Sequence, residues 1–247
     1  MITNYKTLNF LWINKIFGKT EIAFLGIVDG YQKKETTNTI YMRYTPGLIA
    51  KYKNSLFKIA ARGFYQGGKN QAGDDISAFY LNTDIGIKIF EKLNLVAGFE
   101  IMSGNNLQDS LSKTDRAFNI LYGARHKFNG NMDYFSVPIT TDAAGLINPY
   151  LKLNFQINEI VALQASYHYF RLYGDYVYNN GFADKFLGNE IDLNTSIKFF
   201  KYFKLDAGYS AIFATKTLSY IKGGNNRKFN SWAFLMITVD PVLFRSK

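Results

Sequence analysis

The residues best suited to binding chemistry are charged side chains that alternate with apolar residues. Arg43 lies in one alternating segment, and Lys58 and Arg62 lie in the next. A guanidinium donates planar pairs of hydrogen bonds to a carboxylate, and two adjacent guanidiniums repel each other unless an acid or an anionic solute lies between them. The pattern predicts a polar face that binds or steers anions. The alternative is that each arginine pairs with an acid of a neighbouring segment, such as Asp84 or Glu100.

Lysines and acids occupy different depths of the same predicted face. The formal net charge is +10, and we expect a group of lysines near the short turns, whereas the acids lie deeper or toward the long loops. The lysines are Lys15, Lys51, Lys58, Lys88, Lys152, Lys198 and Lys204, and the acids are Asp84, Glu100, Glu190 and Asp192. A basic mouth attracts anions over a long range. Alternatively, the lysines extend to a membrane interface and the charges pair across strands.

The connection at 105–145 is too long for a passive link, since loops beyond about fifteen residues are usually functional or disordered. It carries four basic residues among aromatic ones, which are Arg116, Arg125, His126 and Lys127. We expect this connection to fold inward, over or into the space that the polar face encloses, and to present basic groups at a constriction. The alternative is an extracellular cap with a solvated basic tip.

The sequence offers little for catalysis or metal binding. It has two histidines, His126 and His168, with His168 placed inward on a strand beside Ser166, and it has no Gly-x-Ser-x-Gly elbow. There is no cysteine and no histidine pair at ligand spacing. We therefore predict that the protein is not an enzyme and that it has no metal site and no cofactor.

These side chains are positioned by segments of about ten residues in which apolar residues recur at every second position. The chain has 247 residues, is 47% hydrophobic and has a mean hydropathy of -0.13, without an apolar run long enough for a membrane helix. A transmembrane β-barrel needs only one apolar face per strand. The predicted strands are 5–17, 20–31, 39–52, 55–66, 77–90, 93–104, 146–157, 160–172, 186–199, 203–215 and 230–244.

Aromatic residues concentrate near both ends of these strands, as expected for the two membrane interfaces. The aromatic residues near the short turns are Phe17, Tyr52, Phe57, Phe90, Phe199 and Phe203, and those near the long loops are Tyr65, Phe79, Tyr169, Phe213 and Trp232. The short turns predict the periplasmic end and the long loops the extracellular end. The chain end after Phe244 is then periplasmic.

The turn at Lys53 and Asn54 predicts the register of one hairpin. A two-residue turn pairs Arg43 with Phe64 and makes Arg43 and Arg62 diagonal neighbours on the lumen face. The first two strands are less regular, because four apolar residues would face inward, namely Leu11, Ile13, Leu25 and Ile27.

The strand directions predict an incomplete barrel. The first and last strands both run toward the short turns, so they would meet in parallel, which an antiparallel barrel with an even number of strands does not allow. The start of the chain also lacks a secretory signal. We therefore expect 1–247 to be a single barrel domain of about eleven strands, with an odd number of N-terminal strands missing from a barrel of 14–18 strands.

Four segments carry a family resemblance. The segments 81–86, 97–104, 122–135 and 187–192 resemble the C-terminal part of the alginate-export family of outer-membrane barrels. The resemblance extends over essentially the whole chain and implies a passive diffusion channel. Asn131 stands where the family leads us to expect a bulky apolar residue, and three residues follow Phe244, which bears on recognition by the barrel-assembly machinery.

These patterns predict a porin-like channel in the bacterial outer membrane. It would pass small or polymeric anionic solutes, such as an anionic saccharide, through a charged lumen. Its other partners would be outer-membrane lipid and the barrel-assembly machinery, with no nucleic acid, because the basic residues alternate with lipid-type residues. The alternative is a plugged barrel that acts as an adhesin or a structural anchor.

Overall fold

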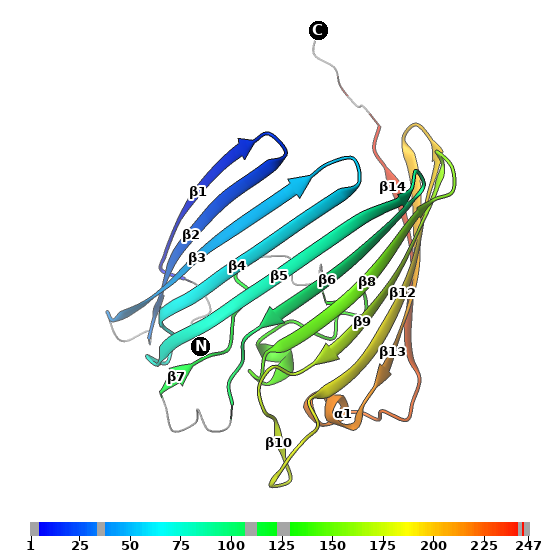
Figure 1. Ribbon diagram of the computed structural model, residues 1–247. Coiled ribbons are helices and arrows are strands. Elements are labelled where there is room, and N and C mark those ends of the chain that lie inside the picture. Colours follow the sequence, from blue (N-terminus) through cyan, green and yellow to red (C-terminus); the bar gives the residue numbers. More distant parts are fainter. Residues whose placement is uncertain (1–4, 34–37, 107–112, 123–128, 242–243, 245–247) are drawn as a thin grey trace.

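The computed structural model describes residues 5–33, 38–106, 113–122, 129–241 and 244. Within them, long antiparallel strands follow one another in a single curved sheet (Figure 1). The long strands are β1 (Thr7–Phe17), β2 (Thr20–Gln32), β3 (Ile40–Lys53), β4 (Phe57–Lys69), β5 (Asp75–Phe90), β6 (Leu93–Met102), β8 (Leu146–Gln156), β9 (Val161–Arg171), β12 (Phe186–Phe200), β13 (Phe203–Ala214) and β14 (Asn230–Val239). The predicted antiparallel all-β fold is confirmed, and every predicted strand is present.

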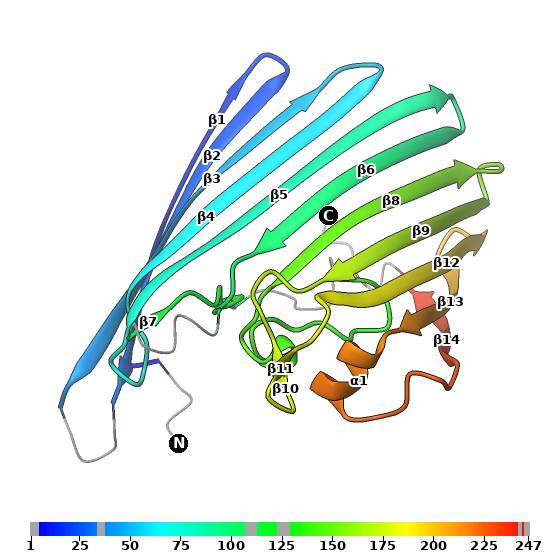
Figure 2. The ribbon, with the colours of Figure 1, turned by 60° about the horizontal axis from the view of Figure 1, so that its bottom comes forward.

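Several short elements lie at the end of the sheet that carries the long connections. Strand β7 (Thr114–Asp115) pairs in parallel with β5, and β10 (Val177–Tyr178) forms a small hairpin with β11 (Gly181–Phe182). Helix α1 (Lys216–Lys222) and a 3-10 turn (Ile139–Thr141) complete the assignment. Figure 2 shows these elements gathered at that end of the sheet. No helix in the described part of the chain is long and apolar enough to cross a membrane.

The alternation of residue types produces two different faces. Leu193 and Tyr209 pair across β12 and β13 and are both exposed on the outer face, whereas Asp192 and Ser210 pair one position earlier and are both buried on the opposite face. We call the latter the inner face, because the described parts of the connection 113–145 pack against it. Successive side chains of a strand point to opposite faces, so this alternation sorts polar from apolar residues along each strand.

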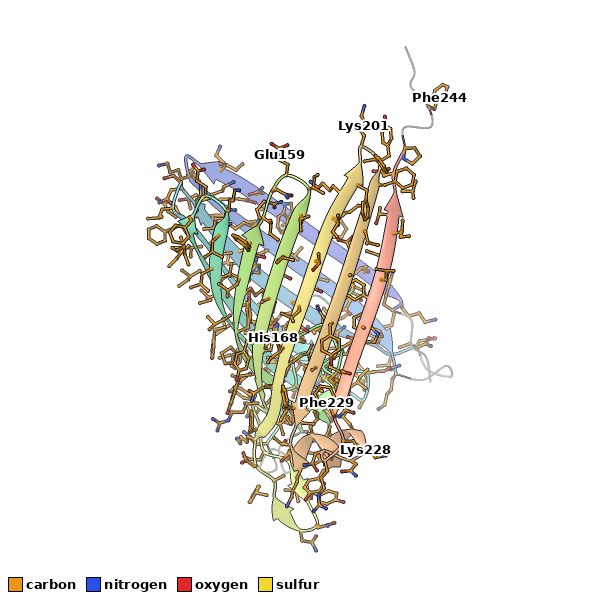
Figure 3. All side chains as sticks on the ribbon, turned by 90° about the vertical axis from the view of Figure 1, so that its right-hand side faces the viewer. Glu159, His168, Lys201, Lys228, Phe229 and Phe244 are labelled. Atoms are coloured by element: carbon orange, nitrogen blue, oxygen red, sulfur yellow. The ribbon has the colours of Figure 1, made fainter. Side chains whose placement is uncertain are left out.

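The two ends of the sheet differ as the sequence predicts. Figure 3 shows Glu159 and Lys201 in tight turns at one end, which we call the turn end, with Phe244 extending beyond it. Lys228 and Phe229 lie at the opposite end, which we call the loop end. The predicted position of Phe244 at the turn end is therefore confirmed.

The predicted register of the β3–β4 hairpin is wrong by four residues. Lys53 pairs with Lys58, since Asn54 closes a longer turn by accepting hydrogen bonds from the backbone N–H groups of Leu56 and Phe57 at 2.9 and 2.6 Å. Arg43 then lies opposite Gly68 and Arg62 opposite Ile49. The two arginines share the inner face, because the shift is even, but they are about 20 Å apart along the strands and are not neighbours.

The edge strands depart from the predicted alternation. The pairing of Leu8 with Asp29 and of Asp29 with Arg43 puts Leu8 on the inner face. Leu25 and Ile27 face inward as predicted, but Leu11, Ile13 and Lys15 face outward, contrary to prediction. The sequence analysis also predicts the wrong face for Trp232. This residue lies opposite the inward Ser210 and not in an outer aromatic girdle.

The sheet is open in the described residues. Strands β1 and β14 each have one neighbour, and both run from the loop end to the turn end. The predicted parallel direction of the first and last strands is therefore confirmed, while the number of strands in a closed barrel remains a prediction.

Candidate functional site

The described parts of the connection 113–145 fold onto the inner face. Phe118, Phe135 and Val137 enter an apolar cluster near the loop end, which confirms the predicted inward folding for these residues. The other buried members of the cluster are Ile76, Ala78, Met102, Ala144, Leu146, Phe170, Leu172, Leu187, Ile212 and Leu218. Several strands contribute to this cluster, so the connection is packed as part of the core.

Hydrogen bonds attach the connection at separated points of the sheet. Gln66 on β4 donates to the carbonyl of Asn119 at 2.8 Å and accepts from its N–H at 2.9 Å. The N–H of Met132 donates to Glu190 Oε1 on β12 at 2.8 Å. Because these anchors lie on distant strands, the connection spans a large part of the inner face.

A second connection supports the first. Thr215 caps α1 by accepting a hydrogen bond from the N–H of Leu218, which belongs to the apolar cluster. At the other end of α1, Lys222 donates to the carbonyl of Tyr134, and its Nζ lies 5.9 Å from the centre of the Phe135 ring. Burial lowers the pKa of Lys222 below its ordinary value, because desolvation disfavours the ammonium.

Arg43 forms a buried ion pair with Asp29 on the adjacent strand. Its Nε and Nη2 donate to the two carboxylate oxygens of Asp29 at 3.1 and 2.5 Å, and Tyr122 of the connection donates to Asp29 Oδ2 at 2.9 Å. Both Arg43 and Asp29 are buried. The guanidinium is thus neutralised by an acid of the adjacent strand, as in the alternative interpretation, but that acid is Asp29 rather than Asp84 or Glu100.

Arg62 pairs with Asp84, as the alternative interpretation anticipated. Its Nη1 donates to Asp84 Oδ2 at 2.7 Å and to the amide oxygen of Asn82. The other carboxylate oxygen of Asp84 accepts from the hydroxyl of Tyr150. Asp84 is therefore compensated on both oxygens, and the two arginines form separate ion pairs.

The remaining predicted acids belong to a buried polar network. Glu100 accepts from the hydroxyl of Tyr80 at 2.8 Å and from the amide of Asn148 at 3.5 Å. Asn148 Oδ1 lies 3.1 Å from His168 Nδ1, and His168 Nε2 lies 3.7 Å from Asp192. His168 lies in the loop-end half of β9 (Figure 3). It is 2% exposed, so it is part of the wall rather than a group on an open surface.

Lysines line the inner face at the turn end. A cavity of about 630 Å³ is lined by Lys51, Lys53, Lys58 and Lys88, and its only carboxylate among the described lining residues is Asp84. Lys51 pairs with Glu21 at 3.3 Å. Lys58 and Lys88 have no ion pair among the described residues, so this cavity carries an excess of positive charge.

The candidate residues of the connection are only partly described. Arg116 is exposed near the loop end, where its N–H donates to Asn105 at 2.6 Å. Arg125, His126 and Lys127 lie outside the described residues, so a constriction formed by them remains a prediction. In the rest of the chain no three His, Cys, Asp or Glu residues are grouped as a metal ion would require.

The sequence analysis missed the partners of the predicted charges. Asp29, Tyr122 and Tyr150 each bind a predicted site residue or its counterion. The sequence could have revealed Asp29, because it lies at every-second spacing from Leu25 and Ile27 and therefore shares their face of the strand. Tyr122 could not, since its contact depends on how the connection folds.

The comparisons with known proteins find likeness only at the level of structure. No family model matches the sequence, and no curated protein matches it. A structure titled as a NanC porin matches 96% of this chain and 100% of its own, with 9% identity and a TM-score of 0.45. The outer membrane phospholipase A of Escherichia coli matches over 94% of this chain and 77% of its own, with 11% identity and a TM-score of 0.39.

The second of these structures corrects one prediction. We predicted from the sequence that the protein is not an enzyme, but a structure to which the chain bears a likeness is titled as a phospholipase. This type of sheet therefore does not exclude an enzyme, and the prediction is withdrawn. At TM-scores below 0.5, neither structure transfers an activity to this chain.

Proposed function

We propose that this chain forms the wall of a porin-like channel in the bacterial outer membrane, with a basic mouth that favours small anionic solutes. The outer face supports the membrane part of the proposal. Leu48 on β3, Leu193 on β12 and Leu235 on β14 are 61%, 51% and 69% exposed there. Contiguous apolar surfaces of this extent are rare on soluble monomers and suit contact with lipid.

The lysine-lined cavity at the turn end carries the proposed preference for anions. Arg43 and Arg62 are neutralised by Asp29 and Asp84, so they contribute little net charge to a solute path. Lys58 and Lys88 instead lack an acidic partner among the described residues. Uncompensated charge at a mouth concentrates counterions, and rings of basic side chains select anions in pores.

The inserted connection supports passage of small solutes rather than wide, unrestricted flow. It leaves a cavity of about 660 Å³ at the loop end, between the connection and the first strands, lined in part by Tyr31, Arg43, Gln66 and Tyr122. Together with the lysine-lined cavity, this space would form part of a path along the inner face. The resemblance to the alginate-export family makes an anionic saccharide the first solute to test.

Reversal potentials across a planar bilayer under a KCl gradient test the proposal. We expect the full protein to pass chloride more readily than potassium. The double substitution Lys58→Glu and Lys88→Glu changes the charge of the mouth by four units and should remove or reverse that preference. Lys228→Glu at the loop end is the matched control and should leave it unchanged. Cation preference in the unmodified protein would reject the anionic part of the proposal.

One observation favours a second function. The apolar cluster occupies part of the loop end of the inner face, as is expected of a plugged barrel used as an adhesin or anchor. Such a protein would insert into bilayers and stay electrically silent. Steady single-channel steps would exclude it.

A further inference from the structure

Two acidic side chains lie inside the wall toward the loop end of β12, two strands from the β14 edge of the sheet. Glu190 and Asp192 are two residues apart on the inner face of β12 and are 0% and 1% exposed. Glu190 Oε2 and Asp192 Oδ1 have no hydrogen-bond donor among the described residues. Two buried carboxylates at neighbouring positions of one face are strongly unfavourable unless a proton or a cation compensates their charge.

Two neutral oxygens in the same region also lack a partner within the described residues. Ser210 lies directly opposite Asp192 in the ladder, is fully buried, and its Oγ has no hydrogen bond. Asn129 is 3% exposed, and its amide nitrogen donates to the carbonyl of Phe135 at 2.9 Å, whereas its Oδ1 has no donor. Buried polar atoms are almost always satisfied, so four such oxygens in one region indicate an absent partner.

The backbone next to Asn129 lies against Glu190. A Cβ atom on the adjacent Gly130 would lie only 2.4 Å from Glu190 Oε1, so the backbone of the connection rests directly on this carboxylate. The N–H of Met132 donates to Glu190 Oε1 at 2.8 Å, whereas Oε2 has no hydrogen-bond donor among the described residues. The open oxygens therefore come from the connection and from two strands of the sheet.

The surrounding cations do not fill this position. His168 Nε2 approaches Asp192 from the other side, at 3.7 Å from Oδ2, and Oδ1 remains open. Lys152 interacts with Asp192 electrostatically, but its Nζ lies over the Tyr150 ring, 4.7 Å from the ring centre, and forms no ion pair within the described chain. No cation in the described part of the chain therefore pairs with the open oxygens.

We propose that Glu190, Asp192, Ser210 and Asn129 bind a calcium ion that fastens the connection to the inner face. All four donors are oxygens, which suit calcium rather than zinc, and magnesium dehydrates too reluctantly for an enclosed position. The site has only two acidic ligands, and its other donors are a hydroxyl and an amide oxygen. It is independent of the proposed channel function, because it requires only the wall and the connection.

Calcium titration of the full protein in detergent, after removal of divalent ions with a chelator, tests the site. We expect CaCl₂ to raise the unfolding temperature and to slow proteolysis within 129–145, whereas MgCl₂ has little effect at the same concentration. Ligand binding stabilises the folded state in proportion to the logarithm of ligand concentration over Kd. Asp192→Asn should weaken calcium binding at least tenfold, while Asp75→Asn, an exposed acid at the end of β5, should bind like the unmodified protein.

Ser210→Ala keeps the test decisive if the acidic variants fail to assemble, because it removes one ligand with little change of shape. It should weaken calcium binding several-fold. Absence of calcium binding at millimolar concentration would overturn the proposal. The proposal would also be overturned if lowering the pH without calcium protected 129–145 from proteolysis equally well. A proton shared by Glu190 and Asp192 would then explain the cluster.

Discussion

Removing the guanidinium of Arg43 should destabilise the fold far more than removing a typical surface charge. The Arg43→Leu variant leaves the carboxylate of Asp29 at 0% exposure, with Tyr122 as a remaining donor. Breaking a buried ion pair by deleting one partner costs about 3–5 kcal/mol, because an uncompensated charge stays out of water. The hydrogen bond from Tyr122 to Asp29, worth about 1.5–3 kcal/mol, does not offset this cost, because it is already present before the substitution. We therefore expect the full cost.

Urea-dependent unfolding in lipid bilayers, followed by tryptophan fluorescence, measures this cost. The double variant Arg43→Leu and Asp29→Leu should recover at least half of it, since no buried charge is left unpaired. The matched control is Lys51→Leu, whose pair with Glu21 is 3.3 Å long and largely exposed. Exposed pairs contribute about 0–1 kcal/mol.

The reasoning fails if Arg43→Leu costs no more than Lys51→Leu. It also fails if the double variant is less stable than Arg43→Leu, because Asp29 would then stabilise the fold through contacts other than the ion pair.

Two further predictions concern the faces of the sheet. Gly98→Ala should destabilise the fold by about 1–3 kcal/mol, since its Cβ would lie 2.0 Å from the ring of Tyr150; Gly86→Ala, whose Cβ would meet nothing closer than 3.5 Å, is the control, and equal unfolding curves for the two variants would contradict this contact. Leu193→Arg, at the middle of β12 on the outer face, should cost about 2–4 kcal/mol in bilayers. Ser196→Arg on the inner face should cost much less, and the reverse order would mean that the assigned faces are exchanged.

The sequence alone determined the strands and most of their faces. Alternation is a local property with a period of two, so Leu193 and Asp192 can be assigned to opposite faces without any knowledge of their neighbours. The same reasoning placed the basic residues at the turn end, with Lys58 and Lys88 where the structure has them. It failed for Lys15 and Trp232 on the edge strands, because both faces of those strands carry apolar residues and alternation then gives no signal.

Only the tertiary structure decided which charged groups meet. The partner of Arg43 depends on the register of β2 against β3, which places Asp29 directly opposite Arg43, and on Tyr122, which comes from a distant connection. The cluster of Glu190, Asp192 and Ser210 beneath the connection is likewise invisible in the sequence. Period-two alternation specifies the face of a residue, whereas its neighbours on that face follow from pairing and packing between segments far apart in the chain.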